Sequence, residues 1–341
     1  MTWALLAILL AVFLVPFASK RVERNLEPFL LVMGLLAALV SGVLDTHLVG
    51  HALAEPVKIT LAVLVFGAVF KYVREHLRRG IRGALKSIPL PLFLFLMVVM
   101  LGLASSAITA IIASLLLVEI ITSLGLSRRA EISLVVVSCS AIGLGAVLTP
   151  IGEPLSTIAI AKLGGEPYHA DFFFLARLLG YLVVPGVLAL GVLAMFLGGA
   201  RRGEGLTEKE LHETFIHVII RAGKTYLFVM ALVLLGSGFQ PVFDIYIVRW
   251  GSGLLYFANI TSAALDNATL AAAEISPQMS ALQIKSALVS LLISGGMLIP
   301  GNIPNIICAG KLRISSREWA RFGVPLGLAM LAVYFVILEV W

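Results

Sequence analysis

Apolar stretches long enough to cross a membrane occupy almost the whole chain and are separated by short polar or charged segments. A helix that spans about 30 Å of hydrocarbon needs about 20 apolar residues, and proline, glycine and charge clusters mark the breaks between them. The pattern predicts twelve passes, at residues 2–19, 28–44, 57–72, 88–103, 104–126, 131–163, 172–199, 215–237, 241–256, 258–275, 284–310 and 322–340. We therefore expect an all-α polytopic membrane protein.

The composition supports a membrane protein and excludes several other classes. Of the 341 residues, 60% are hydrophobic and 13% are charged, whereas a soluble domain carries roughly 25% charged residues. Disorder, a disulfide scaffold and a nucleic-acid-binding domain are excluded. The two cysteines, Cys139 and Cys308, lie in apolar stretches without a CxxC partner, which argues against a disulfide or a metal site. No cofactor is expected.

The basic residues predict the orientation. If the passes alternate, loops 20–27, 71–87, 127–130, 200–214 and 311–321 share one side and carry 18 of the 25 Lys and Arg residues. Loop 45–56, on the other side, carries none. The basic side is expected to be cytoplasmic, with both termini outside, in the cell (inner) membrane. The same basic loops are expected to bind anionic lipid head groups, and the first segment is expected to be a retained helix.

Two segments share an LxPxxxP pattern at an offset of 150 residues. They are Leu148–Pro154 and Leu298–Pro304, and a Ser-Ala pair precedes each of them, at Ser106-Ala107 and Ser262-Ala263. The predicted passes carry the two segments through the membrane in opposite directions. Inverted repeats with broken helices that meet at mid-membrane are a transporter architecture.

The repeat predicts four parts of the chain. Two N-terminal helices occupy residues 1–56, and two inverted five-pass repeats occupy 57–199 and 215–341. A cytoplasmic linker at 200–214 joins the repeats.

Asp266 and Asn267 are the clearest candidates for chemistry. They lie within the apolar pass 258–275, where polar groups are costly and usually functional. A carboxylate at mid-membrane binds a proton or a cation, and the same oxygens can hold either one. The alternative is a protonated Asp266 that bonds to a neighbouring helix.

Glu153 is the second candidate, because Pro150, Gly152 and Pro154 predict a broken helix around it. A break exposes carbonyl groups that coordinate cations. Hydroxyl oxygens lie beside this break at Thr149, Ser156 and Thr157. Together these oxygens suit Na⁺ or Li⁺, and the alternative is a structural proline kink.

The second break carries amides in place of a carboxylate, at Asn302 and Asn305. Amides bind cations through oxygen and anions through nitrogen, so they leave the sign of the substrate open. Further polar residues that could line the same cavity are Asn259, Ser262 and Ser106. Glu119 and Glu274 fall near the ends of their passes, where a solvated position is expected.

The S-A-x-x-D-N pattern at Ser262–Asn267 and the T-P-I-G-E-P segment at Thr149–Pro154 resemble motifs of the ion transporter superfamily. This group includes the NhaD-type sodium/proton antiporters, the arsenite permeases and the divalent-anion/sodium symporters. The chain is also similar in length and layout to a small family of predicted prokaryotic cation transporters. The first-half helix departs from the motifs of this superfamily, because its sequence S-A-I-T-A-I at Ser106–Ile111 contains no acidic residue.

The resemblance implies a secondary transporter, not an enzyme, that exchanges Na⁺ or Li⁺ for H⁺ by alternating access. Asp266 and Glu153 would be the ligands that the metal ion and the proton share. An anion, dicarboxylate or arsenite carrier is the alternative, and an intramembrane hydrolase is a remote one, because GxGD and HExxH motifs are absent. A homodimer is the candidate assembly.

Overall fold

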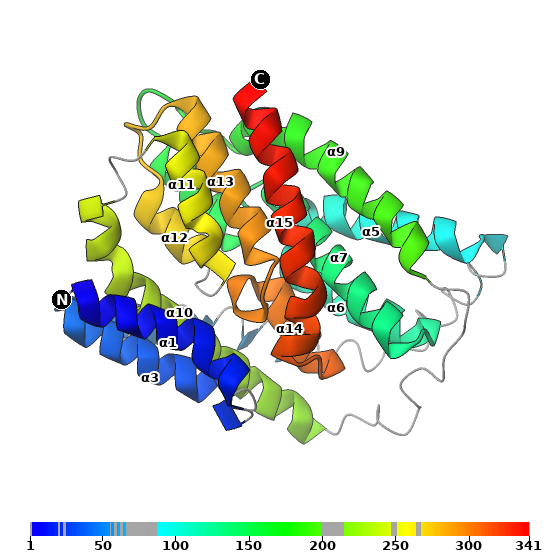
Figure 1. The fold of residues 1–341 in the computed structure, drawn as a ribbon, viewed down its shortest axis with the longest axis horizontal. Helices are drawn as coiled ribbons and strands as arrows, with labels where there is room; N and C mark the ends of the chain where they lie inside the picture. The colour runs from blue at the N-terminus through cyan, green and yellow to red at the C-terminus, as the bar shows by residue number, and fades with distance from the viewer. Residues whose placement is uncertain are drawn as a thin grey trace.

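The computed structural model describes residues 2–19, 21–22, 25–54, 56–57, 60–61, 64–65, 83, 87–198, 215–246, 251–263 and 267–340. These residues form helices, without a β-strand (Figure 1). The helices are α1 (Thr2–Ala18), α3 (Leu26–Ser41), α5 (Leu90–Ile108), α6 (Ala110–Leu124), α7 (Arg128–Ala146), α8 (Pro154–Lys162), α9 (Phe174–Leu197), α10 (Phe215–Tyr246), α11 (Ser252–Ala258), η2 (Asn259–Ala263), α12 (Asn267–Glu274), α13 (Ala281–Gly295), η3 (Ile299–Gly301), α14 (Ile303–Leu312) and α15 (Ser316–Val340).

Four of the described helices, α5, α7, α9 and α15, are long and apolar enough to cross a membrane. Large apolar side chains project outward from three of them: Phe196 is 78% exposed, Met100 64% and Val336 60%. So much exposed apolar surface is unfavourable in water and favourable against lipid. The structure therefore supports the predicted all-α membrane protein, while the count of twelve passes stays a prediction.

Several predicted boundaries are wrong, among them the one between passes 88–103 and 104–126, because α5 continues to Ile108. The helix α10 continues through residues 238–240, where a break between two passes was expected, and contains Pro241. Residues 46–54 are helical, although a loop was predicted at 45–56. The predicted loop at 311–321 shrinks to three residues, because α14 ends at Leu312 and α15 begins at Ser316. The pass at 57–72 and the loop at 71–87 lie largely outside the described residues, and the linker at 200–214 lies wholly outside them.

The continuity of α10 has a packing reason at Gly238. Glycine was read as a break, but Gly238 instead lets α10 approach α3 closely: a Cβ at this position would lie 2.7 Å from the backbone of Ala37. Gly34 on α3 meets α10 in the same way, since its Cβ would lie 2.8 Å from the carbonyl oxygen of Ala231. Small residues at a helix crossing bring two backbones together in a membrane. The N-terminal helices α1 and α3 lie at one edge, alongside α10 (Figure 1).

Contacts between loops agree with the predicted sides. The Arg128 guanidinium donates hydrogen bonds to the carbonyl oxygens of Leu312 and Arg313, both at 2.9 Å, and pairs with Glu318 at 3.3 Å. This joins segments 127–130 and 311–321, which were both placed on the basic side. The Tyr168 hydroxyl donates to the carbonyl oxygen of Met279 and joins the segment between α8 and α9 to the segment between α12 and α13.

The central helix of the bundle is α7. Almost all of its residues are buried, and it packs against α5, α6, α9, α13, α14 and α15. It approaches α5 most closely where Gly145 meets Gly102: a Cβ on Gly145 would overlap the Gly102 carbonyl oxygen. Helix α7 therefore contacts both halves of the bundle.

Short helices from the two halves pack reciprocally. The first half contains α6 and α8, and the second half contains α12 and α14. Helix α6 packs against α14, and α8 packs against α12. Each half therefore contributes two short helices to the boundary between the halves, and each of these helices contacts one short helix of the other half.

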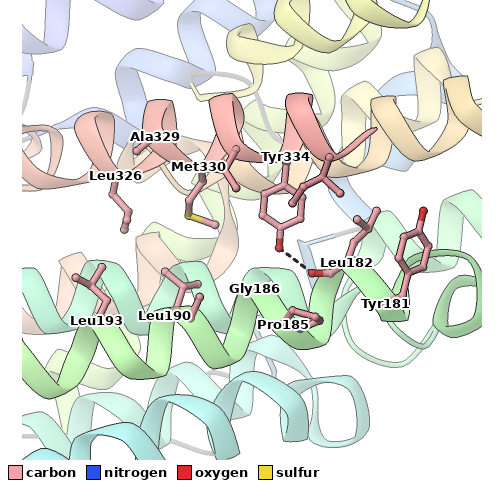
Figure 2. A pocket seen from close by; sticks show the side chains of 13 residues that line it. Tyr181, Leu182, Pro185, Gly186, Leu190, Leu193, Leu326, Ala329, Met330 and Tyr334 are labelled. Atoms are coloured by element: carbon pink, nitrogen blue, oxygen red, sulfur yellow. Dashed lines mark hydrogen bonds between the residues drawn. The ribbon is translucent and has the colours of Figure 1, made fainter. Parts of the chain in front are cut away.

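A largely apolar groove of about 600 Å³ runs between α9 and α15 (Figure 2). At one point the Tyr334 hydroxyl crosses the groove and donates a hydrogen bond of 2.9 Å to the carbonyl oxygen of Leu182. Gly186 lies directly against this hydroxyl, and a Cβ there would overlap it. The contact fixes the spacing of the two helices at this level.

Replacing Gly186 with alanine is expected to lower the melting temperature of the detergent-solubilised protein. The new methyl group would displace the Tyr334 hydroxyl and break its hydrogen bond, at a cost of about 1–3 kcal/mol if this buried hydroxyl stays unpaired. Gly180 on the same helix is the control, because a Cβ there meets no atom within 4 Å. Gly180→Ala should be neutral or stabilising by up to about 1 kcal/mol. Equal melting temperatures for the two variants would contradict this role of Gly186.

Candidate functional site

The first break lies between α7 and α8, as the sequence predicts. Helix α7 ends at Ala146, and Glu153 is the extended residue before Pro154 starts α8. Proline is favourable at the first position of a helix, because that residue needs no backbone donor. Gly152 is required for the tight return, because a Cβ there would overlap the carbonyl oxygen of Ala146.

The second break lies between α13 and α14 and has the same form. Asn302 precedes α14 with φ −154° and ψ 145°, and Glu153 precedes α8 with φ −156° and ψ 162°. The two residues are structural counterparts at an offset of 149, one less than the offset of the LxPxxxP pattern. The pattern aligned Glu153 with Ile303, so the structure shifts the correspondence by one residue. As predicted, one break carries a carboxyl group, at Glu153, and the other carries an amide, at Asn302.

The first-half hydroxyl groups brace the backbone of the break. Thr149 donates to the carbonyl oxygen of Ser106, Thr157 donates to Pro150 at 2.6 Å, and Ser156 donates to Glu153 at 2.7 Å. The Ser106 hydroxyl donates to the Leu103 carbonyl within its own helix. Because these protons are already used on carbonyl groups, the hydroxyl oxygens retain lone pairs for a cation.

A third interruption meets the first break. Thr109 has φ 74° and separates α5 from α6, and its side chain accepts a hydrogen bond from the Ile112 amide. The Ala110 amide donates to the carbonyl oxygen of Gly152 at 2.8 Å. The start of α6 is thus attached to the loop that carries Glu153.

The two halves meet through this attachment. Ile111, beside Ala110, and Ile303, beside Asn302, belong to one apolar cluster around Leu115 and Ile307. The Asn302 amide also faces α7, because a Cβ on Gly143 would lie 2.7 Å from its nitrogen. The breaks of the two halves therefore lie on either side of one small contact region.

The second-half amides cap backbone carbonyls and direct their oxygens elsewhere. Asn305 donates to the carbonyl oxygens of Gly295 and Leu298, both at 2.8 Å. Asn259 donates to Ser290 at 2.9 Å. Because each nitrogen faces acceptors, each amide oxygen must point the other way. Neither oxygen has a hydrogen-bond partner within the described part of the chain.

Asp266 lies outside the described residues, so its distance to Glu153 and Asn302 stays a prediction. Its neighbours are described. Ser262 is buried and donates to the carbonyl oxygen of Leu291 at 3.1 Å. Asn267 is 2% exposed, and its amide nitrogen has no partner among the described residues. The carbonyl oxygen of Ser262 also lies close to Gly301, since a Cβ on Gly301 would be 2.7 Å from it. Ser262 therefore adjoins the second break.

Two acidic residues are buried where solvated positions were expected. Glu119 and Glu274 are each 5% exposed, so that prediction is wrong for both. The passes were judged by their length along the chain, whereas burial at a helix end depends on which helices cover it. Glu274 is the last residue of the short α12, and α12 packs against α8, α10 and α13. A signal was available in the sequence, because Glu274 follows Asn267 by seven residues and so shares its helix face.

The chemistry of this region is that of oxygen ligands in a buried setting. The groups include the Glu153 carboxyl, the amide oxygens of Asn259 and Asn305, and carbonyl groups at two breaks. Hard cations prefer such ligands. No group of three or more His, Cys, Asp or Glu residues that could hold a metal ion occurs among the described residues. Cys139 and Cys308 are buried free thiols, as expected for residues without a disulfide.

Comparison with known proteins gives one family. The model of the family described as "Protein of unknown function (DUF1646)" matches residues 2–341. No curated protein matches the chain.

Proposed function

Because this match spans all but the first residue, the chain belongs to the DUF1646 family, and we propose that this member is a secondary transporter that exchanges Na⁺ or Li⁺ for H⁺. The observation that carries the proposal is the pair of broken helices with polar residues at the same backbone position. Glu153 stands at one break and Asn302 at the other, and both side chains are buried.

The reciprocal packing supports an inverted repeat as the framework for this exchange. If α5–α9 and α11–α15 are related by a two-fold axis in the membrane plane, α6·α14 and α8·α12 are equivalent contacts. Such a relation lets one half move against the other around a fixed site. Alternating access then exposes the two breaks to each side in turn.

The proposed ligands are oxygen atoms from both halves. Asp266 and Glu153 supply negative charge, and the amide oxygens of Asn259, Asn302 and Asn305 supply neutral dipoles. The cation and the proton are substrates that compete for the carboxylates, so binding of one releases the other. Thr149, Ser156, Thr157, Ser106, Ser262 and Asn267 shape the break regions and are secondary candidates for contact with the ion.

An anion carrier is the second candidate, and one observation favours it. Helices α8 and α14 both begin at the breaks, and free amides at helix N-termini attract anions. The Asn267 nitrogen, without an acceptor among the described residues, is a further donor. Glu153 and Asp266 would oppose an anion unless a cation or a proton neutralised them.

Purified protein in liposomes with an internal pH dye tests the proposal. Addition of Na⁺ or Li⁺ outside should release internal protons from vesicles preloaded with acid, and K⁺ and choline serve as controls. Protein-free liposomes give the leak rate. A proton flux that depends on added anions and ignores Na⁺ and Li⁺ would favour the carrier alternative. No flux with either series would refute both.

A further inference from the structure

Glu274 is a buried carboxyl group that the proposed exchange at Asp266 does not use. Its side chain is 5% exposed, and neither carboxyl oxygen accepts a hydrogen bond from any described residue. Its polar neighbour is the side-chain amide of Asn259, which is 1% exposed. A buried carboxyl without donors is unfavourable as a bare anion.

The helices around Glu274 offer no described ion pair that would hold it as an anion. Lys285 on α13 lies over the Tyr181 ring, 5.1 Å from its centroid, and Lys224 on α10 pairs with Glu27 at 3.6 Å. No described ion pair includes Glu274. The titratable or charged residues on the elements that pack against α12 are Glu153 and Lys162 at the two ends of α8, His217, Arg221, Lys224, Tyr226, Asp244 and Tyr246 on α10, and Lys285 on α13.

A proton on Glu274 would remove the cost of burying this carboxyl as a bare anion. The amide oxygen of Asn259 lacks a donor within the described structure, because its nitrogen is directed at the Ala287 carbonyl and at Ser290. A protonated carboxyl has one O–H to donate. Unmade hydrogen bonds of buried groups are expensive, and neither Glu274 oxygen has a partner among the described residues, so the acid form of Glu274 costs less than the ionised form in this setting.

The position of Glu274 gives such a proton a route. Glu274 follows Asn267 by two helical turns on the same face, about 10 Å along the axis of α12. Immediately beyond it, Pro277 and Gln278 form an exposed turn. Tyr168 from the α8–α9 segment bonds to Met279 at this end of the bundle. Glu274 thus lies on α12 between the exposed turn and Asn267, the residue that follows Asp266 in the sequence.

We propose that Glu274, together with Asn259, is a proton-binding site that relays protons between the turn at 277–278 and Asp266. The relay role rests on the proposed exchange, whereas the presence of a bound proton does not. In each transfer the proton leaves the Glu274 carboxyl, and a proton from water at the turn or from Asp266 replaces it. Intramembrane carboxyl groups serve as relays of this kind in other pumps and transporters.

Infrared difference spectroscopy of the purified protein tests the bound proton without any transport. Over about pH 5 to 9, the wild type should show a protonated-carboxyl band that disappears in Glu274→Gln. Glu119→Gln is the matched control, because Glu119 is equally buried in the first half and its replacement should leave the band in place. A spectrum unchanged by Glu274→Gln would overturn the proposal. If Glu274→Gln does not fold, Glu274→Asp should keep a titrating band at a shifted frequency.

Transport and binding measurements then test the relay. Glu274→Gln should slow Na⁺-driven proton flux at least about tenfold, while calorimetric Na⁺ binding to the purified variant stays at the wild-type affinity. An unchanged flux would overturn the relay. If the wild type itself shows neither flux nor Na⁺ binding, the proposed exchange fails, and the infrared result still decides whether Glu274 holds a proton.

Discussion

Asp266→Asn is expected to abolish cation-dependent proton movement in liposomes. Asparagine keeps the shape of the side chain but removes both its negative charge and its titration, so it can no longer exchange a proton for a cation. In the wild type, the apparent affinity for the cation should weaken as the pH falls, because protons then occupy the carboxylate. The dye-reported flux on addition of Na⁺ or Li⁺ measures both effects.

The control for this variant is Asp171→Asn. Asp171 is exposed in the segment before α9, where Arg177 donates a hydrogen bond of 2.8 Å to its carboxylate and lowers the pKa of that group. Its removal should leave the flux at the wild-type rate. Exchange at the wild-type rate by Asp266→Asn would remove the central residue from the proposed mechanism, provided that the variant keeps the wild-type elution profile.

Gly145→Ala should prevent the protein from folding stably. The new Cβ would overlap the carbonyl oxygen of Gly102, which belongs to the backbone of α5. A side chain could rotate away, but here a whole helix must move. Gly102 has no room to yield, since its own Cβ position is 2.8 Å from Val187 on α9. Overpacking of this kind costs about 3 kcal/mol, which the melting temperature in detergent would record.

Gly310→Ala provides the comparison for this substitution. Gly310 lies on α14 and a Cβ there meets no atom within 4 Å, so alanine should be neutral or slightly stabilising. Wild-type stability in Gly145→Ala would mean that α5 and α7 do not cross at these glycines. Comparison of the two variants separates the general effect of a glycine-to-alanine change on the melting temperature from the effect of forcing α5 and α7 apart.

The helical membrane character and the two breaks followed from sequence alone. Apolar length decides partition into lipid, and proline at 150, 154, 300 and 304 acts on its own backbone. These are local effects, so they need no knowledge of neighbouring helices. For the same reason the sequence correctly placed Glu153 and Asn302 at the breaks.

The tertiary structure decided which polar groups are buried and which breaks meet. Glycine was read as a break at 238, yet there it allows α3 and α10 to approach each other. Glu274 was read as solvated from its place at the end of a pass, yet it is buried, and its helix α12 packs against three other helices. The attachment of Ala110 to Gly152 joins residues 42 positions apart. Helix ends and glycines have the same local sequence in either setting, and only the packing of distant helices determines whether water, lipid or protein surrounds them.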